Sequence, residues 1–227
     1  MKISEIFYSI QGEGSLLGVP SVFVRTSGCN LRCTWCDTPY TSWRPEGQVL
    51  SIDEIVARVE EYKARHVVVT GGEPMIAPEI SPLTGRLRAA GLHITIETAG
   101  TVYVPVECDL MSISPKLANS TPTEREGGKW AAQHERLRFQ PDVLRRLMAE
   151  YLCQLKFVVS SAEDLAEIEV IRSACEASPE SVILMPEGTS RAILQERAVW
   201  LAEICKQTGY RLSPRMHVNL WGDRRGV

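Results

Sequence analysis

Short runs rich in valine and isoleucine alternate with amphipathic segments along the chain, and this alternation limits the possible folds more than any other feature. Seven runs have the length and composition of buried strands, at residues 22–26, 66–70, 92–97, 110–114, 154–159, 182–185 and 215–220. Most of the segments between them place apolar residues at helical spacing. Strands that alternate with helices form a mainly parallel sheet, so the sequence predicts an α/β fold, either an open sheet or part of a β/α barrel.

The helix signal is strongest directly after residue 50. Ser51 followed by Glu54 is a capping-box pattern, and the apolar residues from Ile52 to Val59 share one helical face. Further helices are predicted before Gly91, after Pro141, and over residues 162–177 and 190–209.

Two stretches break the alternation. Residues 28–48 contain clustered cysteines, and residues 117–140 are polar and contain a pair of glycines. We predict a long loop or mobile cover for the second stretch, which could act as a lid that excludes water from a reaction.

Length and composition exclude several classes of protein. A chain of 227 residues can bury a full core, and we predict a single domain over residues 1–227. The net charge of −3 and the lack of a Lys/Arg run argue against nucleic acid as a partner. No apolar stretch approaches the roughly 20 residues that span a bilayer, and the N-terminal segment lacks the apolar core of a secretory signal. We therefore expect a cytoplasmic protein that binds neither membrane nor nucleic acid.

Three of the seven cysteines lie within eight residues, in the run GCNLRCTWCDT. This crowding fits reduced thiols at a metal site better than a disulfide framework. A structural zinc ion takes four protein ligands, whereas an iron–sulfur cubane held by Cys29, Cys33 and Cys36 leaves one iron open for another ligand. A zinc site completed by Cys108 or a histidine is the alternative. The remaining cysteines, Cys108, Cys153, Cys175 and Cys205, show no metal-ligand spacing and are predicted to pack as small apolar residues.

The C-x3-C-x2-C spacing, with Trp35 before the last cysteine, resembles the radical S-adenosylmethionine (SAM) superfamily. Its members bind SAM at the open iron of a [4Fe–4S] cluster and reduce its sulfonium to release a 5′-deoxyadenosyl radical. The run TGGEP at residues 70–74 resembles their glycine-rich SAM-binding motif, in which glycines permit close approach of the backbone to the ligand. The resemblance implies a [4Fe–4S] cluster, SAM, and an incomplete TIM-like β/α barrel.

Over nearly its whole length the sequence is similar to the 7-carboxy-7-deazaguanine synthase family of queuosine and 7-deazapurine biosynthesis. Four segments carry the similarity: SIQGEGSLLGVPSVFVRTSGCNLRCTWCDT, VVVTGGEP, ETAGT followed by SPK, and SPRMHVNLWGDRRGV. Members of this family convert 6-carboxy-5,6,7,8-tetrahydropterin into 7-carboxy-7-deazaguanine, contracting the ring with loss of ammonia. The resemblance implies the same lyase reaction here, a homodimer, and an external electron donor of the flavodoxin or ferredoxin type.

The resemblance also implies the site residues. Cys29, Cys33 and Cys36 would hold the [4Fe–4S] cluster, and Thr38 would bind Mg²⁺. The implied SAM contacts are Thr34, Trp35, Cys36, Gly72, Glu73, Ser114, Pro115, Lys116, Gln154, Leu155, Lys156 and Phe157. The implied substrate contacts are Ile10, Gln11, Gly12, Glu13, Arg25, Thr70 and His217, with Arg215 beside His217 as a residue that closes the site.

Simple chemistry supports some of these assignments and leaves alternatives for others. A planar guanidinium such as that of Arg25 suits a substrate carboxylate, although a surface ion pair is its alternative role. A lone hydroxyl at Thr38 suits Mg²⁺, which keeps water ligands and uses substrate oxygens. Lys156 could extend along an apolar surface and Phe157 could belong to the core.

Two other functions remain possible from the sequence. An enzyme that installs a glycyl radical on a partner protein shares the cysteine spacing, and a zinc-stabilised binding module without catalysis would use the cysteines differently. Ala99 stands where family members commonly carry asparagine, which removes no implied ligand.

Overall fold

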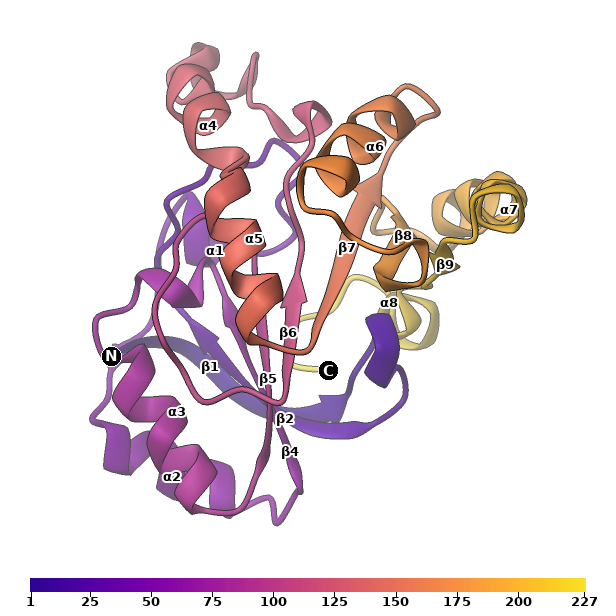
Figure 1. The fold of residues 1–227 in the computed structure, drawn as a ribbon. Helices are drawn as coiled ribbons and strands as arrows, with labels where there is room; N and C mark the ends of the chain where they lie inside the picture. Colours follow the sequence, from indigo (N-terminus) through magenta and orange to yellow (C-terminus); the bar gives the residue numbers. More distant parts are fainter.

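A nine-stranded sheet runs through the computed structural model, which describes residues 1–227 (Figure 1). The strand order is β3-β1-β2-β4-β5-β6-β7-β8-β9. From β2 onward each strand pairs in parallel with the next, while β1 is antiparallel to both β2 and β3. Strands that follow chain order in a parallel sheet are typical of β/α barrels. Because β3 and β9 lie at opposite edges, the barrel is incomplete, as predicted.

The strands agree with six of the seven predicted runs. Their bounds are β1 Lys2–Ile10, β2 Pro20–Thr26, β3 Gln48–Val49, β4 His66–Gly71, β5 His93–Thr98, β6 Leu110–Ile113, β7 Cys153–Val159, β8 Val182–Pro186 and β9 Arg211–Leu212. Strands β1, β3 and β9 were not predicted from the sequence. The run at 215–220 was wrongly predicted as a strand, since it forms a helix in which only Val218 is fully buried. Short apolar runs do not distinguish a strand from a helix.

The helices are α1 Pro39–Ser42, α2 Ile52–Glu60, α3 Ile80–Ala89, α4 Ala131–Arg138, α5 Pro141–Glu150, α6 Asp164–Ala174, α7 Arg191–Thr208 and α8 Met216–Trp221. Figure 1 shows α3, α5, α6 and α7 following one another around the sheet. The predicted capping box is confirmed, because the Glu54 amide donates to Ser51 Oγ at 3.2 Å and the Ser51 amide donates to Glu54 Oε2 at 2.8 Å.

The core lies between the sheet and these helices. Val67, Val68 and Val69 of β4 are at most 1% exposed, which explains the continuous apolar run in a strand covered on both faces. Polar residues follow at the carboxyl ends of the parallel strands, for example Thr70 after β4's valines and Thr98 at the end of β5. Parallel strands bring such residues to one edge of the sheet, where α/β proteins bind their ligands.

The segment 117–140 is not the long loop that its polar composition predicted. It contains α4 and the short 3₁₀ segments Ala118–Ser120 and Arg125–Gly128. The Thr34 amide donates to the Ser120 carbonyl at 2.8 Å, and Trp35 Nε1 donates to the Asn119 carbonyl at 3.1 Å. The segment is therefore packed against the cysteine loop as a support, which differs from the mobile cover expected from composition.

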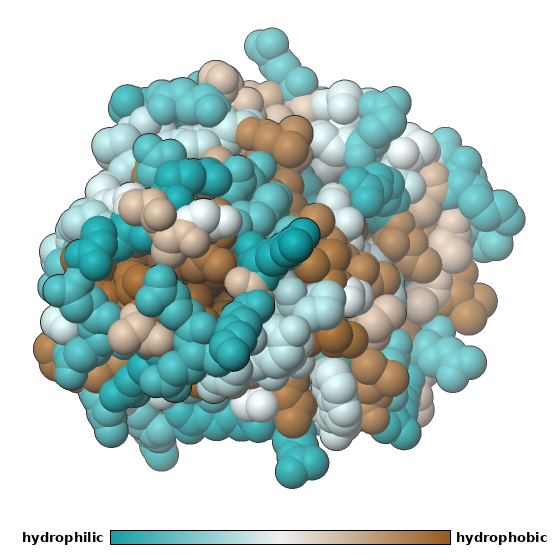
Figure 2. All heavy atoms as spheres, turned by 90° about the horizontal axis from the view of Figure 1, so that it is seen from below, coloured by the Kyte–Doolittle hydropathy of each residue, from teal (hydrophilic) through white to brown (hydrophobic).

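The surface gives no single location for a partner chain. On the face in Figure 2, hydrophilic residues surround smaller groups of hydrophobic ones. The most exposed large hydrophobic side chains belong to separate elements: Val49 in β3, Leu152 before β7 and Val199 in α7. The homodimer implied by the family resemblance stays a prediction. None of the helices combines the length and apolar character needed to cross a membrane.

Candidate active site

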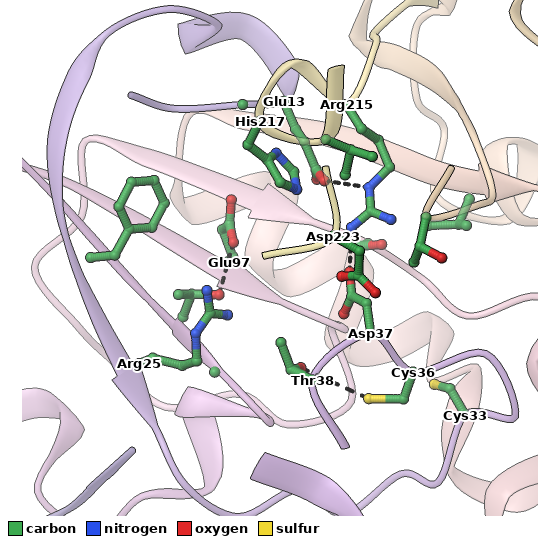
Figure 3. Close-up of a pocket in the computed structure, with 18 of the residues that line it drawn as sticks. Glu13, Arg25, Cys33, Cys36, Asp37, Thr38, Glu97, Arg215, His217 and Asp223 are labelled. Atoms are coloured by element: carbon green, nitrogen blue, oxygen red, sulfur yellow. Dashed lines mark hydrogen bonds and ion pairs between the residues drawn. The ribbon is translucent and has the colours of Figure 1, made fainter. Parts of the chain in front are cut away.

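A cavity of about 500 Å³ opens at the carboxyl ends of the parallel strands. It brings together residues from the first strand, the cysteine loop, the strand ends and the C-terminal tail. The predicted site residues that line it are Ile10, Gln11, Gly12, Glu13, Arg25, Cys29, Cys33, Trp35, Cys36, Thr38, Thr70, Gly72, Ser114, Lys116, Lys156, Arg215 and His217. Figure 3 shows Cys33 and Cys36 at one end of this cavity and Glu13 with His217 at the other.

Six residues predicted to contact SAM do not line the cavity: Thr34, Glu73, Pro115, Gln154, Leu155 and Phe157. Leu155 and Phe157 are fully buried in the core, which is the alternative role considered for Phe157. Gln154 accepts hydrogen bonds from the Ser15 amide at 2.8 Å and from Ser15 Oγ at 2.6 Å, and so supports the segment before β2. The run QLKF thus points alternate side chains into the core and toward the site, as a strand must.

Three cysteine side chains reach the cavity from one loop. Burial raises the pKa of both Cys29 and Cys33 to about 12, so these thiols would ligate only a group whose positive charge displaces their protons. No three His, Cys, Asp or Glu side chains are close enough together to hold a single metal ion. A cubane binds each sulfur at a different iron and therefore accepts a wider triangle of ligands. Cys108, which could have completed a zinc site, lies outside the cavity with Sγ 3.7 Å from the Ile94 carbonyl oxygen.

The cysteine loop is fixed from several sides by groups that the sequence analysis did not single out. Trp43 Nε1 donates to the Cys33 carbonyl at 3.0 Å, and the Arg32 amide donates to His134 Nδ1 at 3.1 Å. His134 is buried, and desolvation lowers its pKa to about 4, so the ring is neutral. Because Nδ1 accepts a hydrogen bond from the Arg32 amide, Nε2 carries the ring hydrogen and donates it to Ser120 Oγ at 2.8 Å. His134 thereby connects α4 to the backbone next to Cys33.

The glycine turn after β4 packs directly beneath the cysteine loop. A Cβ on Gly72 would lie 2.1 Å from the Gly28 carbonyl oxygen and 2.9 Å from Cys29 Cβ. Glu73 is buried below the turn and accepts hydrogen bonds from Thr98 Oγ1 and the Ala99 amide, both at 2.7 Å. Burial raises the pKa of Glu73. In this structure the glutamate joins β4 to the end of β5, and the glycine permits contact between two backbones.

We expect Gly72→Ala to displace the cysteine loop, because the new methyl group meets backbone atoms and not a flexible side chain. Overpacking of this kind costs about 1–3 kcal/mol, which should appear as a lower urea midpoint together with less iron per chain after reconstitution. Gly85→Ala in α3 is the matched control, since no atom lies within 4 Å of its added Cβ and alanine favours a helix. A Gly72→Ala protein with wild-type iron content and midpoint would contradict this reading of the turn.

Four charged residues that line the cavity form a network, and Figure 3 labels three of them, Glu13, Arg215 and Asp37. Glu13 accepts from Lys156 Nζ and, at 3.1 Å, from Arg215 Nε. Arg215 also donates through Nη2 to Asp37 and through Nη1 to the Gly188 carbonyl at 2.7 Å. Burial alone would raise the pKa of Glu13, but Lys156 and Arg215 hold it well below its usual range. Lys156 is therefore a buried partner of Glu13, which rules out the alternative role in which it extends along an apolar surface toward solvent.

A second acceptor in the cavity is Glu97, which entered the sequence analysis only as the first residue of the segment ETAGT. Its carboxylate accepts from Gln11 Nε2 at 3.0 Å and from Thr70 Oγ1 at 2.8 Å. Glu97 is the last residue but one of β5, which runs parallel to β4 and its polar end. A carboxylate near the carboxyl end of a parallel strand is the signal that could have identified it.

Thr38 and Asp37 have different environments although they are adjacent in sequence. Thr38 lines the cavity with its hydroxyl 3.8 Å from Cys36 Sγ, while the Asp37 carboxylate is committed to Arg215. The Thr38 hydroxyl therefore has no charged side chain as a hydrogen-bond partner.

Three clustered cysteines above a glycine turn, at the open edge of an incomplete β/α barrel, define a radical SAM protein. The Radical SAM superfamily model matches residues 23–115. A crystal structure of Streptococcus suis SuiB bound to S-adenosylmethionine shares the fold, with a TM-score of 0.55 at 12% identity over 82% of this chain and 48% of that chain.

More similar proteins narrow the class. A crystal structure of QueE from Escherichia coli matches with a TM-score of 0.70 and 27% identity, covering 95% of this chain and 94% of that one. The 7-carboxy-7-deazaguanine synthases of Halobacterium salinarum and Rhodopirellula baltica are 48% and 46% identical, over 98% and 99% of this chain and 91% and 88% of theirs. The chain belongs to the 7-carboxy-7-deazaguanine synthase family. Membership implies a [4Fe–4S] cluster and SAM, and it removes the zinc module and the glycyl-radical activating enzyme from consideration.

Proposed function

We propose that this chain converts 6-carboxy-5,6,7,8-tetrahydropterin into 7-carboxy-7-deazaguanine, with ring contraction and loss of ammonia, in the 7-deazaguanine and queuosine pathway. The observation that carries the proposal is the combination, within one cavity, of the cysteine loop, the Glu97 carboxylate and the Arg25 guanidinium. These three groups match the three chemical parts of the reaction: the cofactor, the pyrimidine edge of the pterin, and the substrate carboxylate.

The pterin edge presents adjacent N–H donors from its ring nitrogen and its amino group. A carboxylate can accept both, and the Glu97 carboxylate is already oriented by Gln11 and Thr70. His217 lies against Gly12, so that a Cβ on Gly12 would be 2.1 Å from His217 Nδ1. We assign Gln11, Thr70 and Glu97 to the pyrimidine edge and His217 to the adjacent wall.

The cysteines fit the cluster, and Gly72, Ser114 and Lys116 fit the neighbouring SAM. When bound, the cluster and SAM supply the one-electron chemistry that starts the rearrangement. The residues of the chain bind, orient and shield the pterin, and the low-dielectric cavity strengthens each of their charged contacts. An external one-electron donor of the flavodoxin or ferredoxin type would supply the electron.

We further propose Mg²⁺ at Thr38. One neutral hydroxyl provides a single protein ligand, which is sufficient for a cation that keeps several waters and uses the oxygens of its substrate. The Asp37 carboxylate is already paired with Arg215. This pairing favours Thr38 over Asp37 as the Mg²⁺ ligand.

An anaerobic turnover assay tests the reaction. Reconstituted protein, SAM and a reductant are incubated with 6-carboxytetrahydropterin, with and without Mg²⁺, and products are identified by mass. We expect 7-carboxy-7-deazaguanine, in larger yield with Mg²⁺. Formation of 5′-deoxyadenosine without any deazaguanine would disprove the substrate assignment and leave the cofactor assignment intact.

A further inference from the structure

Glu5 is a charged residue in β1 that no motif identified, and it lies at an irregularity of the sheet. The register of β1 against β2 shifts between Ile3 and Glu5, so that Glu5 stands directly opposite Arg25. A bulge of this kind redirects a side chain, and residues directly opposite in an antiparallel pair project from the same face. The side chain of Glu5 is only 14% exposed and that of Arg25 only 18% exposed.

Three donors from distant parts of the chain converge on this one carboxylate. Arg25 Nε lies 2.7 Å from Oε1, and the Tyr40 hydroxyl donates to the same oxygen at 3.0 Å. Arg225 Nε, from the C-terminal tail, lies 3.2 Å from Oε2. Glu5 therefore joins β1 to β2, to α1 and to the tail.

The contact with Glu5 uses only one side of the Arg25 guanidinium. The Arg25 side chain makes no other hydrogen bond in the structure, and the centre of the Phe7 ring lies 5.5 Å from Arg25 Cζ. Both Nη atoms are free of protein acceptors on a side chain that lines the cavity, and Figure 3 shows the group pointing toward Glu97. Two parallel Nη–H donors form the fork that binds a carboxylate in bidentate geometry.

Glu5 also fastens the tail that forms one wall of the cavity, residues 222–227. Besides Glu5, Arg225 contacts Glu46 at 3.2 Å and stacks over the Tyr40 ring at 3.9 Å. Its side chain is 45% exposed, and exposed pairs of this kind are individually weak. Several weak contacts of Arg225 thus hold the tail. One of them is with Glu5, which also pairs with Arg25.

We propose that Glu5 is a positioning residue for substrate binding. By holding Nε of Arg25, it directs the Nη fork toward the carboxylate of the pterin, and through Arg225 it keeps the tail beside the same ligand. Without this anchor Arg25 has other acceptors within the cavity, since the Glu97 and Asp37 carboxylates also line it. The inference rests on the proposed function, because it names the group that orients the substrate carboxylate.

Glu5→Gln keeps the shape of the side chain and removes its charge, so it tests the proposal directly. We expect KM for 6-carboxytetrahydropterin to rise about 10- to 100-fold, with kcat changed less than about threefold, as for the loss of one charge-assisted contact that acts on binding. Glu46→Gln is the matched control, since Glu46 contacts Arg225 but not Arg25, and should change KM less than about threefold. Glu5→Asp restores the charge and should recover part of the lost affinity.

The second readout separates positioning from a general structural role. Binding of 6-carboxytetrahydropterin and of a tetrahydropterin without the carboxylate is compared by anaerobic titration calorimetry. We expect Glu5→Gln to weaken binding of the carboxylated ligand more strongly than binding of the ligand without the carboxylate. Equal weakening of both ligands, or an unchanged KM in Glu5→Gln, would overturn the proposal. Failure of the proposed function has a different signature, in which the wild-type protein makes no deazaguanine and binds neither pterin.

Discussion

Cys33→Ala protein should contain little iron after anaerobic reconstitution and should make no detectable 7-carboxy-7-deazaguanine. Changes to groups that only support a metal ligand cost about 10- to 100-fold in metal affinity or activity, so the loss of a ligand itself should exceed about 100-fold. Iron and sulfide content, the visible absorption of the cluster, and product yield by mass spectrometry check this expectation.

Cys153→Ala is the control for this result. Cys153 begins β7 with its thiol 3.4 Å from the Leu147 carbonyl oxygen, and it does not line the cavity. It should retain iron, colour and turnover near wild-type values. Wild-type iron content and activity in Cys33→Ala would show that the three-cysteine assignment is wrong.

The gathering of three cysteines at the site and the parallel strands could be predicted because the information for each is local. Cys29, Cys33 and Cys36 lie on one loop, so their spacing alone limits the groups that they can hold together. The valines of β4 form an unbroken apolar run because both faces of a central parallel strand are covered.

Other elements carry weaker local signals. Lys2–Ile10 forms the longest strand, yet only one of its residues is fully buried and a bulge interrupts its alternation. Such a strand near the edge of the sheet lacks both the apolar run and the regular period that sequence patterns detect. Helix α4 was not predicted because most of its residues are polar and its one buried side chain is a histidine.

The ionic contacts of the site could not be predicted because they depend on how the sheet curves. Asp37 and Arg215 are 178 residues apart in sequence, and Glu5 and Arg225 are 220 residues apart. Each pair forms only when the first strand, the cysteine loop and the tail meet around the cavity. Motifs identified Arg25 and Glu13 as site residues. The residues that pair with their side chains could be found only in the structure.

Arg215→Gln should destabilise the protein by about 3 kcal/mol, which we expect to see as a lower urea midpoint under anaerobic conditions. The side chain of Arg215 is only 9% exposed, and it is the only donor to Asp37 and one of two cationic partners of Glu13. Removing one member of a buried ion pair costs about 3–5 kcal/mol, because the remaining charge is left without compensation. We expect the lower end of this range, since Lys156 still neutralises Glu13 and the Asp37 side chain is 41% exposed.

Arg145→Gln provides the comparison for an exposed pair. Its partner Asp142 is 92% exposed and Arg145 itself 47%, so this change should cost less than about 1 kcal/mol. Equal midpoints for Arg215→Gln and the wild type would show that the network contributes nothing to stability. Arg215→Lys should fall between them, since an ammonium keeps the charge but cannot span three acceptors with a fixed fork.

The same network predicts how stability responds to acid. The pKa of Glu13 is lower in the folded protein than its ordinary value near 4.5, so its ion pairs stabilise the fold above that pH and this stabilisation is lost as the pH falls. Without Arg215 the pKa of Glu13 in the folded protein rises toward its value in the unfolded chain. The folded and unfolded proteins then bind more similar numbers of protons. Arg215→Gln should therefore lose less additional stability than the wild type when the pH is lowered from 7 through 4.5. A variant with a lower midpoint but an unchanged acid dependence would show that Arg215 stabilises the fold by packing rather than through the Glu13 charge.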